Sequence, residues 1–352
     1  EDGNLWMSNS RSYSSLITVL KPNGTWKAFP STKFNNYQIE SIEIDRNGYK
    51  WIKQVTGKIT VFDSGALDDD NDDRSFQIGD NNSVLPNSSI TAIKADKEGV
   101  IWVGTNEGLT IFNCSSNIFD GTCQGNRPII SQDNFNGYLL EGEEILDIAV
   151  DGANRKWVGT KNGLFLLSED GYDQLAYFTK ENSPLFDNEV GKLAVDGITG
   201  TLYIASGIGI QSFRSDATTG LRKMKAEDIA IFPHPVEPDY DGPIAISNLA
   251  DQANVKITDI SGRLVYETTA LGGQAPHSHC GARTYSSRSS RAHRFNLCQS
   301  RDSSERPSTL DFRSFGSPFE REILPAALAD VALGIADPHP YPLAREVGRH
   351  GT

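Results

Sequence analysis

The chain has 352 residues, which is enough to build a large core and more than one domain. It carries 46 acidic and 33 basic residues and a net charge of −13. This acidity argues against a nucleic-acid partner, because such partners are bound by neutralising phosphates. No apolar run approaches the roughly 20 residues of a membrane helix, and the start does not resemble a signal peptide.

An imperfect repeat runs through most of residues 1–214. Its clearest copy, Ser89 to Asn113, consists of three short alternating or β-branched runs separated by two turns. The copies align on aromatic anchors at Trp6, Trp51, Trp102, Trp157 and Tyr203. These anchors are 45 to 55 residues apart, close to the roughly 40 to 50 residues of a four-stranded propeller blade. A blade cannot bury both of its faces alone, so we expect the anchors to pack between neighbouring blades and not to stack on a ligand.

An aspartate precedes the anchor in each of the four longer copies, at Asp45, Asp96, Asp151 and Asp196. It suits a turn between the first and second strands, because its carboxylate can accept a backbone N–H two residues on. The first copy matches only from this turn onward, so we expect the chain to begin inside a blade. The lack of a signal peptide then says nothing about secretion.

The predicted fold is all-β. Residues 1–225 form β-propeller blades in five repeat units, the first truncated, and the incomplete ring leaves exposed edges. A small Ig-like antiparallel β-sandwich follows over residues 229–274, and residues 275–352 form an anomalous tail.

These repeats resemble a known family. Ile90 to Phe112 and Ile145 to Leu166 match the string I-x-x-I-x-x-D-x-x-G-x-I-W-V-G-T-x-x-G-L-x-x-F closely. This string resembles the two-component regulator propeller repeat of sensor and surface proteins in Bacteroidetes. Ile42 to Phe62 departs from it, with Lys53 and Gln54 in place of Gly-Thr. The resemblance implies the fold and says little about activity, because one fold serves many functions.

Two local features of the repeats bear on ligands. Ala66 to Arg74 is the densest acidic run, and it lacks the glycine and distal glutamate of a defined Ca²⁺ loop, so we favour a solvated loop. Cys114 and Cys123 flank a short insertion. A local disulfide there would suit an exported protein, although spacing alone does not settle whether the two thiols pair. Zinc has little support, because His234 is the only histidine before the tail.

The second module opens at Ile229 with a proline-rich stretch and continues as short strands. It resembles the C-terminal sorting domain of the type IX secretion system, although an unrelated sandwich remains an alternative. The residues that carry the resemblance are Pro233, Pro235, Asp259, Gly262, Gly272, Gly273 and Gln274. We expect recognition through the hairpin Val255 to Thr268 and the Gly272 to Gln274 turn, where missing side chains let a partner approach the backbone.

Propeller repeats followed by this module resemble surface components of the type IX system. The resemblance implies an exported protein on the outer face of the outer membrane. Its implied partners are a PorU/PorV/PorQ-like attachment complex, which includes the sortase PorU, and anionic lipopolysaccharide. None of these partners follows from composition or spacing.

The tail beyond Gln274 changes character. Residues 275–352 contain ten arginines and no lysine, and Ser/Arg clusters replace alternation. We suspect a frameshift just after Gln274, which would leave the sandwich without its last strands. A natural basic, disordered tail is the alternative.

Catalytic signatures are missing from the body of the sequence. It has no G-x-S-x-G elbow, H-E-x-x-H helix, P-loop or dinucleotide fingerprint, so we predict no catalytic, cofactor-binding or metal-binding residues and no enzyme. Two alternatives remain. One is the ligand-sensing periplasmic propeller of a hybrid two-component regulator, and the other is a carbohydrate-active enzyme whose site lies in the central channel.

Overall fold

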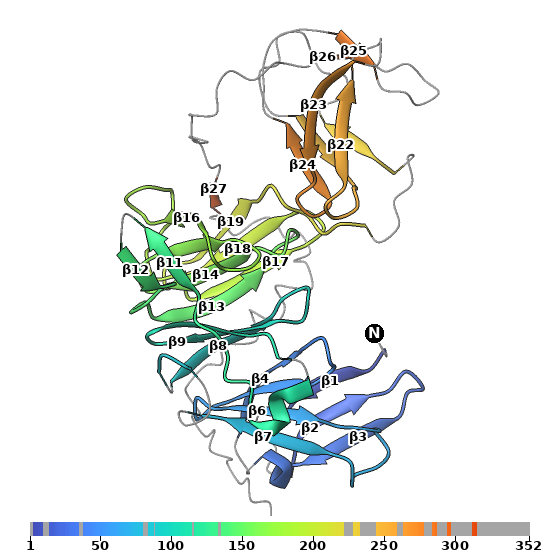
Figure 1. The fold of residues 1–352 in the computed structure, drawn as a ribbon, viewed down its shortest axis with the longest axis vertical. Coiled ribbons are helices and arrows are strands. Elements are labelled where there is room, and N and C mark those ends of the chain that lie inside the picture. The colour runs from blue at the N-terminus through green and yellow to red at the C-terminus, as the bar shows by residue number, and fades with distance from the viewer. Residues whose placement is uncertain are drawn as a thin grey trace, which may run out of the picture. The chain divides into compact units, whose positions relative to one another are not determined.

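The computed structural model describes 13 stretches of the chain. They are residues 3–9, 14–34, 38–79, 84–87, 89–114, 116–132, 135–221, 228–232, 244–258, 263–277, 284–286, 294–296 and 312–314. The elements within them are strands and two short 3-10 helices (Figure 1). The predicted all-β propeller architecture is confirmed.

The blades follow one another along the chain as antiparallel sheets (Figure 1). Blade 1 contains β1 (Leu5–Ser8), β2 (Ser15–Leu20) and β3 (Trp26–Pro30), followed by the 3-10 helix η1 (Ser31–Phe34). Blade 2 contains β4 (Ile39–Ile44), β5 (Lys50–Gln54), β6 (Ile59–Asp63) and β7 (Arg74–Ile78). Because Trp6 lies on β1 as Trp51 lies on β5, blade 1 matches the repeat from its second strand onward.

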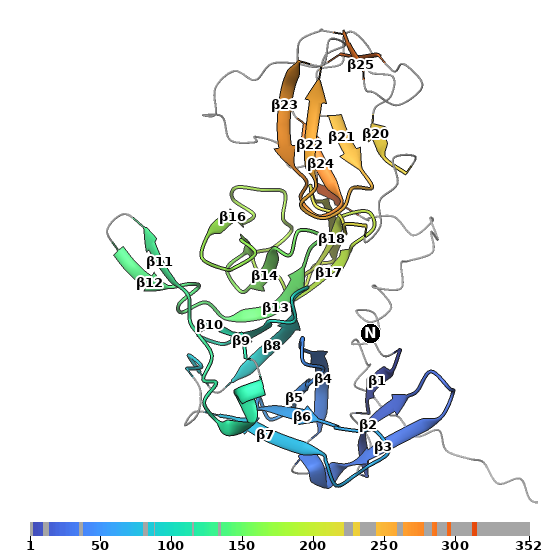
Figure 2. The same ribbon diagram turned by 45° about the vertical axis from the view of Figure 1, so that its right-hand side comes forward.

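Blade 3 contains β8 (Ile90–Ala95), β9 (Ile101–Thr105) and β10 (Gly108–Phe112). Here the structure departs from the expected four strands. After the 3-10 helix η2 (Ser116–Asp120), the described chain pairs with β10 by a single bridge, between Ile111 and Asn126. Pro128, two residues later, has no N–H to donate to a strand ladder. The chain then forms the separate hairpin β11 (Ile129–Gln132) and β12 (Phe135–Tyr138), which Figure 2 shows extending away from β9 and β10.

Blades 4 and 5 have four strands each. Blade 4 contains β13 (Ile145–Val150), β14 (Lys156–Thr160), β15 (Leu164–Leu167) and β16 (Gln174–Phe178). Blade 5 contains β17 (Lys192–Asp196), β18 (Thr201–Ala205) and β19 (Ile210–Arg214), and its fourth strand is β27 (Phe312–Ser314), taken from far along the chain.

The core lies between consecutive blades. Four clusters of buried side chains join blade 1 to 2, blade 2 to 3, blade 3 to 4 and blade 4 to 5. Trp51, Trp102 and Trp157 are at most 1% exposed and belong to three different clusters. Each blade therefore depends on its neighbours to bury its faces.

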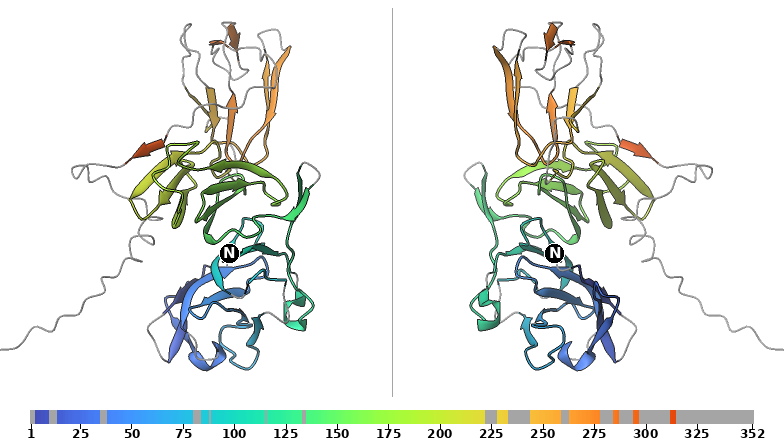
Figure 3. Two further views of the ribbon diagram at one scale, coloured as in Figure 1. Left: turned by 90° about the vertical axis from the view of Figure 1, so that its left-hand side faces the viewer. Right: turned by 90° about the vertical axis from the view of Figure 1, so that its right-hand side faces the viewer.

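The second module contains two small sheets (orange in Figure 3). One contains β20 (Ala230–Phe232), β21 (Ile244–Ser247) and β24 (Gln274–His277), and the other is the hairpin β22 (Asn254–Thr258) and β23 (Leu264–Thr269). Its core is a small cluster around Ile246, Leu249 and Ala275. The pair β25 (Thr284–Ser286) and β26 (Arg294–Asn296) follows.

Candidate functional site

The aspartate of each repeat organises the turn between the first and second strands. In blade 2, Asp45 Oδ1 accepts hydrogen bonds from the backbone N–H groups of Asn47 and Tyr49 at 2.8 and 3.0 Å. Asp45 Oδ2 accepts the indole Nε1–H of Trp51 at 2.9 Å. One carboxylate thus closes the turn and fixes the anchor ring, which agrees with a packing role for both residues.

Blade 3 repeats this arrangement and adds a buried cation. Asp96 Oδ1 accepts from the N–H groups of Glu98 and Val100, and Oδ2 accepts from Trp102 Nε1 at 3.1 Å. Lys156 Nζ, from blade 4, lies 2.9 Å from Asp96 Oδ2 and 4.5 Å from the centre of the Trp102 ring. Burial lowers the pKa of Lys156, and the Asp96 carboxylate opposes that shift.

Blade 4 departs from the pattern at its anchor. Arg155 occupies the place of Tyr49 and Val100, and its Nε donates to Asp151 Oδ2 at 2.8 Å. The indole Nε1–H of the buried Trp157 then has no hydrogen-bond partner among the described residues. Arg155 also reaches Asp216 of blade 5 with a 2.6 Å contact. In blade 4 the aspartate therefore binds Arg155 and not the anchor ring, and Arg155 links blade 4 to blade 5.

Blade 5 has a weaker version of the turn. Asp196 Oδ1 accepts from the N–H of Ile198 at 3.0 Å, and Oδ2 accepts from the Thr199 hydroxyl at 2.6 Å. Tyr203 replaces tryptophan and is half-buried. Burial raises the pKa of Tyr203, and the negative charge of Asp196 adds to that shift.

Two of the anchor rings are covered by the lysine that precedes the next anchor. Lys50 Nζ lies 4.1 Å from the centre of the Trp6 ring, and Lys156 covers Trp102 in the same way. At the alternate positions Ile101 shares a core cluster with Trp51, and Leu202 shares one with Trp157. Cationic and aliphatic side chains therefore alternate along the blades at one structural position.

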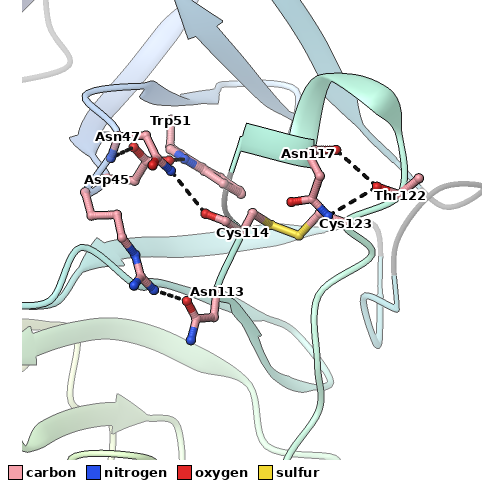
Figure 4. The surroundings of a disulfide bond; sticks show 9 residues. Asp45, Asn47, Trp51, Asn113, Cys114, Asn117, Thr122 and Cys123 are labelled. Carbon is pink, nitrogen blue, oxygen red and sulfur yellow. Dashed lines mark hydrogen bonds between the residues drawn. A yellow bond between two sulfur atoms is a disulfide. The ribbon is translucent and has the colours of Figure 1, made fainter.

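The segment after the third strand of a blade is here called the connection, and in blades 2, 3 and 4 it packs on the preceding blade. In blade 4 the connection packs so tightly on blade 3 that a Cβ at Gly171 would lie 2.5 Å from the Trp102 ring. In blade 3 the connection carries the disulfide Cys114–Cys123, whose Cα atoms are 5.9 Å apart (Figure 4). Asn47 Nδ2 donates to the Cys114 carbonyl at 3.1 Å, and Arg46 donates to Asn113, so this connection is tied to the turn of blade 2.

The acidic run forms the connection of blade 2 and pairs with blade 1. Lys21, Lys27 and Lys33 contact Asp68, Asp70 and Asp73 respectively. Asp72 accepts the N–H of Ala66 at 2.8 Å within the same loop. The carboxylates are committed to lysines and to the backbone, and no group of three or more metal-ligating side chains occurs among the described residues.

A row of charged side chains lies on the first strands of four consecutive blades, at Glu43, Lys94, Asp147 and Lys192. Lys94 Nζ lies 2.9 Å from Glu43 Oε1, and the N–H of Ala95 donates to Glu43 Oε2 at 3.2 Å. Asp147 Oδ2 accepts the N–H of Leu193 at 2.9 Å, and Lys192 Nζ lies 3.8 Å from Asp147 Oδ1.

Burial raises the pKa of Asp147, although Lys192 and Lys94 both oppose the shift. This row was not predicted from the sequence. The alternation of side chains along each first strand could have indicated it. Glu43 and Lys94 precede their turn aspartates by two residues, and Asp147 and Lys192 precede theirs by four. The charges neutralise one another in pairs, so their geometry favours holding blades together over acid–base chemistry.

The predicted residues of the second module lie partly outside the described residues. Those outside are Pro233, Pro235, Asp259 and Gly262, together with His234. Gly272 and Gly273 are buried, and Gln274 begins β24. The backbone that approaches the two glycines belongs to Gly152, Thr218 and Thr219 of the same chain.

Comparisons with known proteins agree with this architecture. A family model described as two component regulator propeller matches residues 84–107. The chain is similar to PorZ of Porphyromonas gingivalis, described as an essential bacterial surface component of the type-IX secretion system. The two are 26% identical with a TM-score of 0.55, over 84% of this chain and 43% of PorZ. This chain therefore spans less than half of PorZ.

The extracellular domain of a proposed hybrid two component system from B. thetaiotaomicron is 17% identical, with a TM-score of 0.41, over 85% of this chain and 38% of that one. Virginiamycin B lyase from Staphylococcus aureus is 13% identical, with a TM-score of 0.41, over 61% and 64%. No curated protein matches. Within the described stretches, no helix is long and apolar enough to cross a membrane.

Proposed function

We propose that this chain is a non-enzymatic component of a bacterial cell surface that serves a type IX secretion system. The similarity to PorZ, which extends over most of the chain, is the observation that carries this proposal. The site geometry supports a scaffold, because the repeated aspartates and aromatic anchors are occupied in packing one blade against the next. Residence on the outer face of the outer membrane is part of the proposal.

The proposed ligand is anionic lipopolysaccharide. The experiment immobilises lipopolysaccharide with an anionic polysaccharide in one channel and a neutral one in the other, and passes the purified chain over both. We expect binding to the anionic form that weakens as salt is added, because exposed charge pairs are screened. Equal retention on the neutral form would remove anionic lipopolysaccharide from the proposal.

The proposed protein partners are a PorU/PorV/PorQ-like attachment complex. Support comes from the order of the modules, with propeller blades before a module of short strands. We take this module to be the sorting-type β-sandwich expected over residues 229–274. The test mixes the purified chain with the purified P. gingivalis complex and separates bound from free protein by size. Co-elution is expected, and separate elution at every ratio would count against this partner while leaving the lipopolysaccharide result untouched.

A second candidate is a ligand-sensing propeller of a two-component regulator, favoured by the family model that matches residues 84–107. A sensor propeller should be stabilised by a small soluble ligand, since binding to the native state raises the unfolding temperature. A thermal-shift screen of soluble oligosaccharides separates the two candidates. Stabilisation by one oligosaccharide, with no retention on lipopolysaccharide, would favour the sensor.

A further inference from the structure

The connection of blade 5 runs into the second module through a hydrogen-bonded joint. We define the joint as Ala217 to Leu221 with the glycines and backbone groups that contact it. The N–H of Thr219 donates to the Gly197 carbonyl of blade 5 at 2.7 Å. The N–H of Gly273 donates to the Thr218 carbonyl at 2.7 Å, and Thr218 and Gly272 form a parallel bridge.

The module continues these bonds on its own side. The N–H of Leu221 donates to the Leu249 carbonyl, and the N–H of Leu249 donates to the Gly273 carbonyl, both at 2.9 Å. Ala217 is fully buried and Thr218 is 8% exposed. The segment is therefore paired to blade 5 on one side and to the module on the other, unlike a solvated linker.

Glycines make this close approach possible. A Cβ at Gly272 would lie 1.9 Å from the Thr218 carbonyl oxygen, and one at Gly273 would lie 2.6 Å from the Thr219 carbonyl oxygen. On the propeller side, a Cβ at Gly152 would lie 2.1 Å from the carbonyl carbon and oxygen of Thr218. Any side chain at these three positions would force the joint apart.

A lysine side chain reaches the same place. Lys97 Nζ, from the turn of blade 3, donates to the Gly152 carbonyl. Burial lowers the pKa of Lys97, and the opposing negative charges include Asp251 of the module as well as Asp151 and Glu169 of blade 4. The turns of blades 3, 4 and 5 thus all contribute to the surface against which the module packs.

The exposed face of the hairpin β22–β23 differs from the joint, because its contacts are made within the hairpin. Its polar side chains contact one another: Lys256 Nζ lies 3.2 Å from Glu267 Oε1, and Asn254 Nδ2 donates to the same oxygen at 2.9 Å. The Gly272 to Gln274 turn, by contrast, has its backbone groups used by the joint.

We propose that the joint is a latch that hides the Gly272 to Gln274 turn. Docking on blades 4 and 5 and contact of an outside protein with this turn are mutually exclusive, because both need the backbone of Gly272 and Gly273. The latch itself does not depend on the proposed function. Only the identity of the outside protein, which would be a component of the attachment complex, rests on it.

The test opens the latch from the propeller side, so that the turn keeps its own sequence. Gly152→Ala introduces the methyl group that meets Thr218, at a position without positive φ. Gly207→Ala is the matched control, because it also lacks positive φ and has nothing within 4 Å of the added Cβ. Hydrogen exchange of the purified full-length chains is followed by mass spectrometry, without lipopolysaccharide or partner.

In Gly152→Ala we expect amide exchange in residues 217–221 and 271–275 to accelerate by about tenfold or more, while residues 101–112 of blade 3 keep their protection. Gly207→Ala should match the native chain. An antibody fragment raised against a peptide of residues 271–275 should bind Gly152→Ala and not the native chain. Native-like exchange in Gly152→Ala, or binding of the antibody to the native chain, would overturn the latch.

A second variant is needed because Gly152→Ala could also accelerate exchange by unfolding blade 4 as a whole. Gly273→Ala places its methyl group against the Thr219 carbonyl from the module side, again without positive φ. Accelerated exchange at residues 217–221, with blade 4 protected, would support the latch. Native-like exchange in this variant would refute it. Because no ligand is present, these results are independent of the tests of the proposed function.

Discussion

The two kinds of turn in blades 2 and 4 differ by one hydrogen bond. Trp51 donates its indole N–H to Asp45. Within the part of the chain that the structure describes, Trp157 donates to no partner, because Arg155 occupies the carboxylate oxygen. Both rings are at most 1% exposed. An identical change of tryptophan to phenylalanine at each site therefore isolates the indole bond.

We expect Trp51→Phe to lower the free energy of unfolding by about 1 to 3 kcal/mol more than Trp157→Phe does, because it leaves a buried carboxylate oxygen without its partner. The loss of ring volume is common to both variants. Urea denaturation followed by circular dichroism measures the difference. Equal costs, or a larger cost at Trp157, would mean that the indole bond contributes nothing.

The partly buried carboxyl of Asp147 gives the fold a dependence on pH. Its pKa is raised in the folded state, so its contribution to stability is fully present below the unfolded pKa and is lost as pH rises through the folded pKa. Asp147→Asn has no such loss, and its amide oxygen can still accept the N–H of Leu193.

The stability of Asp147→Asn relative to the native chain should therefore increase between about pH 4 and about pH 8. Urea midpoints at the two pH values give the comparison. Asp187→Asn is a control, since that carboxyl lies outside the first-strand row. A difference between Asp147→Asn and the native chain that stays constant with pH would show that burial of Asp147 costs nothing.

At the scale of elements, the connection of blade 3 is a short loop closed by a disulfide. Replacing both Cys114 and Cys123 by serine removes the constraint on the unfolded chain, which a chain-entropy treatment of so short a loop values at about 2 to 3 kcal/mol. We expect a loss of that order in the free energy of unfolding, measured in guanidinium chloride.

The same double replacement at Cys280 and Cys298 serves as its control. It should leave the unfolding midpoint of the blades unchanged. If both pairs cost the same, the effect comes from cysteine replacement in general and not from the connection.

The elements also show how far the sequence could predict the structure. The turns at Asp45, Asp96 and Asp151 and their anchors could be predicted, because a period of one blade repeats the same local physics. The departure at Trp157 could not, because it depends on Arg155 reaching Asp216 in another blade. The missing fourth strand of blade 3 also escaped prediction, since an insertion leaves the pattern of its neighbours intact.

The candidate site was less predictable than the fold. The charge and the position of the first-strand row vary from blade to blade, so the blade period does not single it out. Only the alternation along each first strand could have indicated it. The Gly272 and Gly273 pair could be picked out as a place of close backbone approach, and the structure identifies the approaching backbone as Thr218 and Thr219. Which backbone approaches is a tertiary fact that no local pattern encodes.

For the whole molecule, blade 5 is notable because a segment from far along the chain completes it. Among the described residues, its third strand β19 is paired on its outer side by the three residues of β27 alone. A chain that ends at His277 would lose β27 and leave a row of unpaired N–H and C=O groups, which is a template for association.

We expect the shortened chain to associate more strongly than the full chain as its concentration rises, as measured by sedimentation velocity. Adding Ser212→Lys to the shortened chain should reduce association, because a charge on an edge strand disfavours pairing. A shortened chain that stays as monomeric as the full chain would show that β27 does not protect this edge.

The covering of each anchor by the following blade gives folding a direction along the chain. Trp6, Trp51, Trp102 and Trp157 each acquire their cover from residues one repeat later. During synthesis a blade therefore stays unfinished until the next repeat has left the ribosome, and the front of stable structure lags behind the growing end by about one blade. A break anywhere in the series leaves the blade before it uncovered, so damage would spread toward the N-terminus.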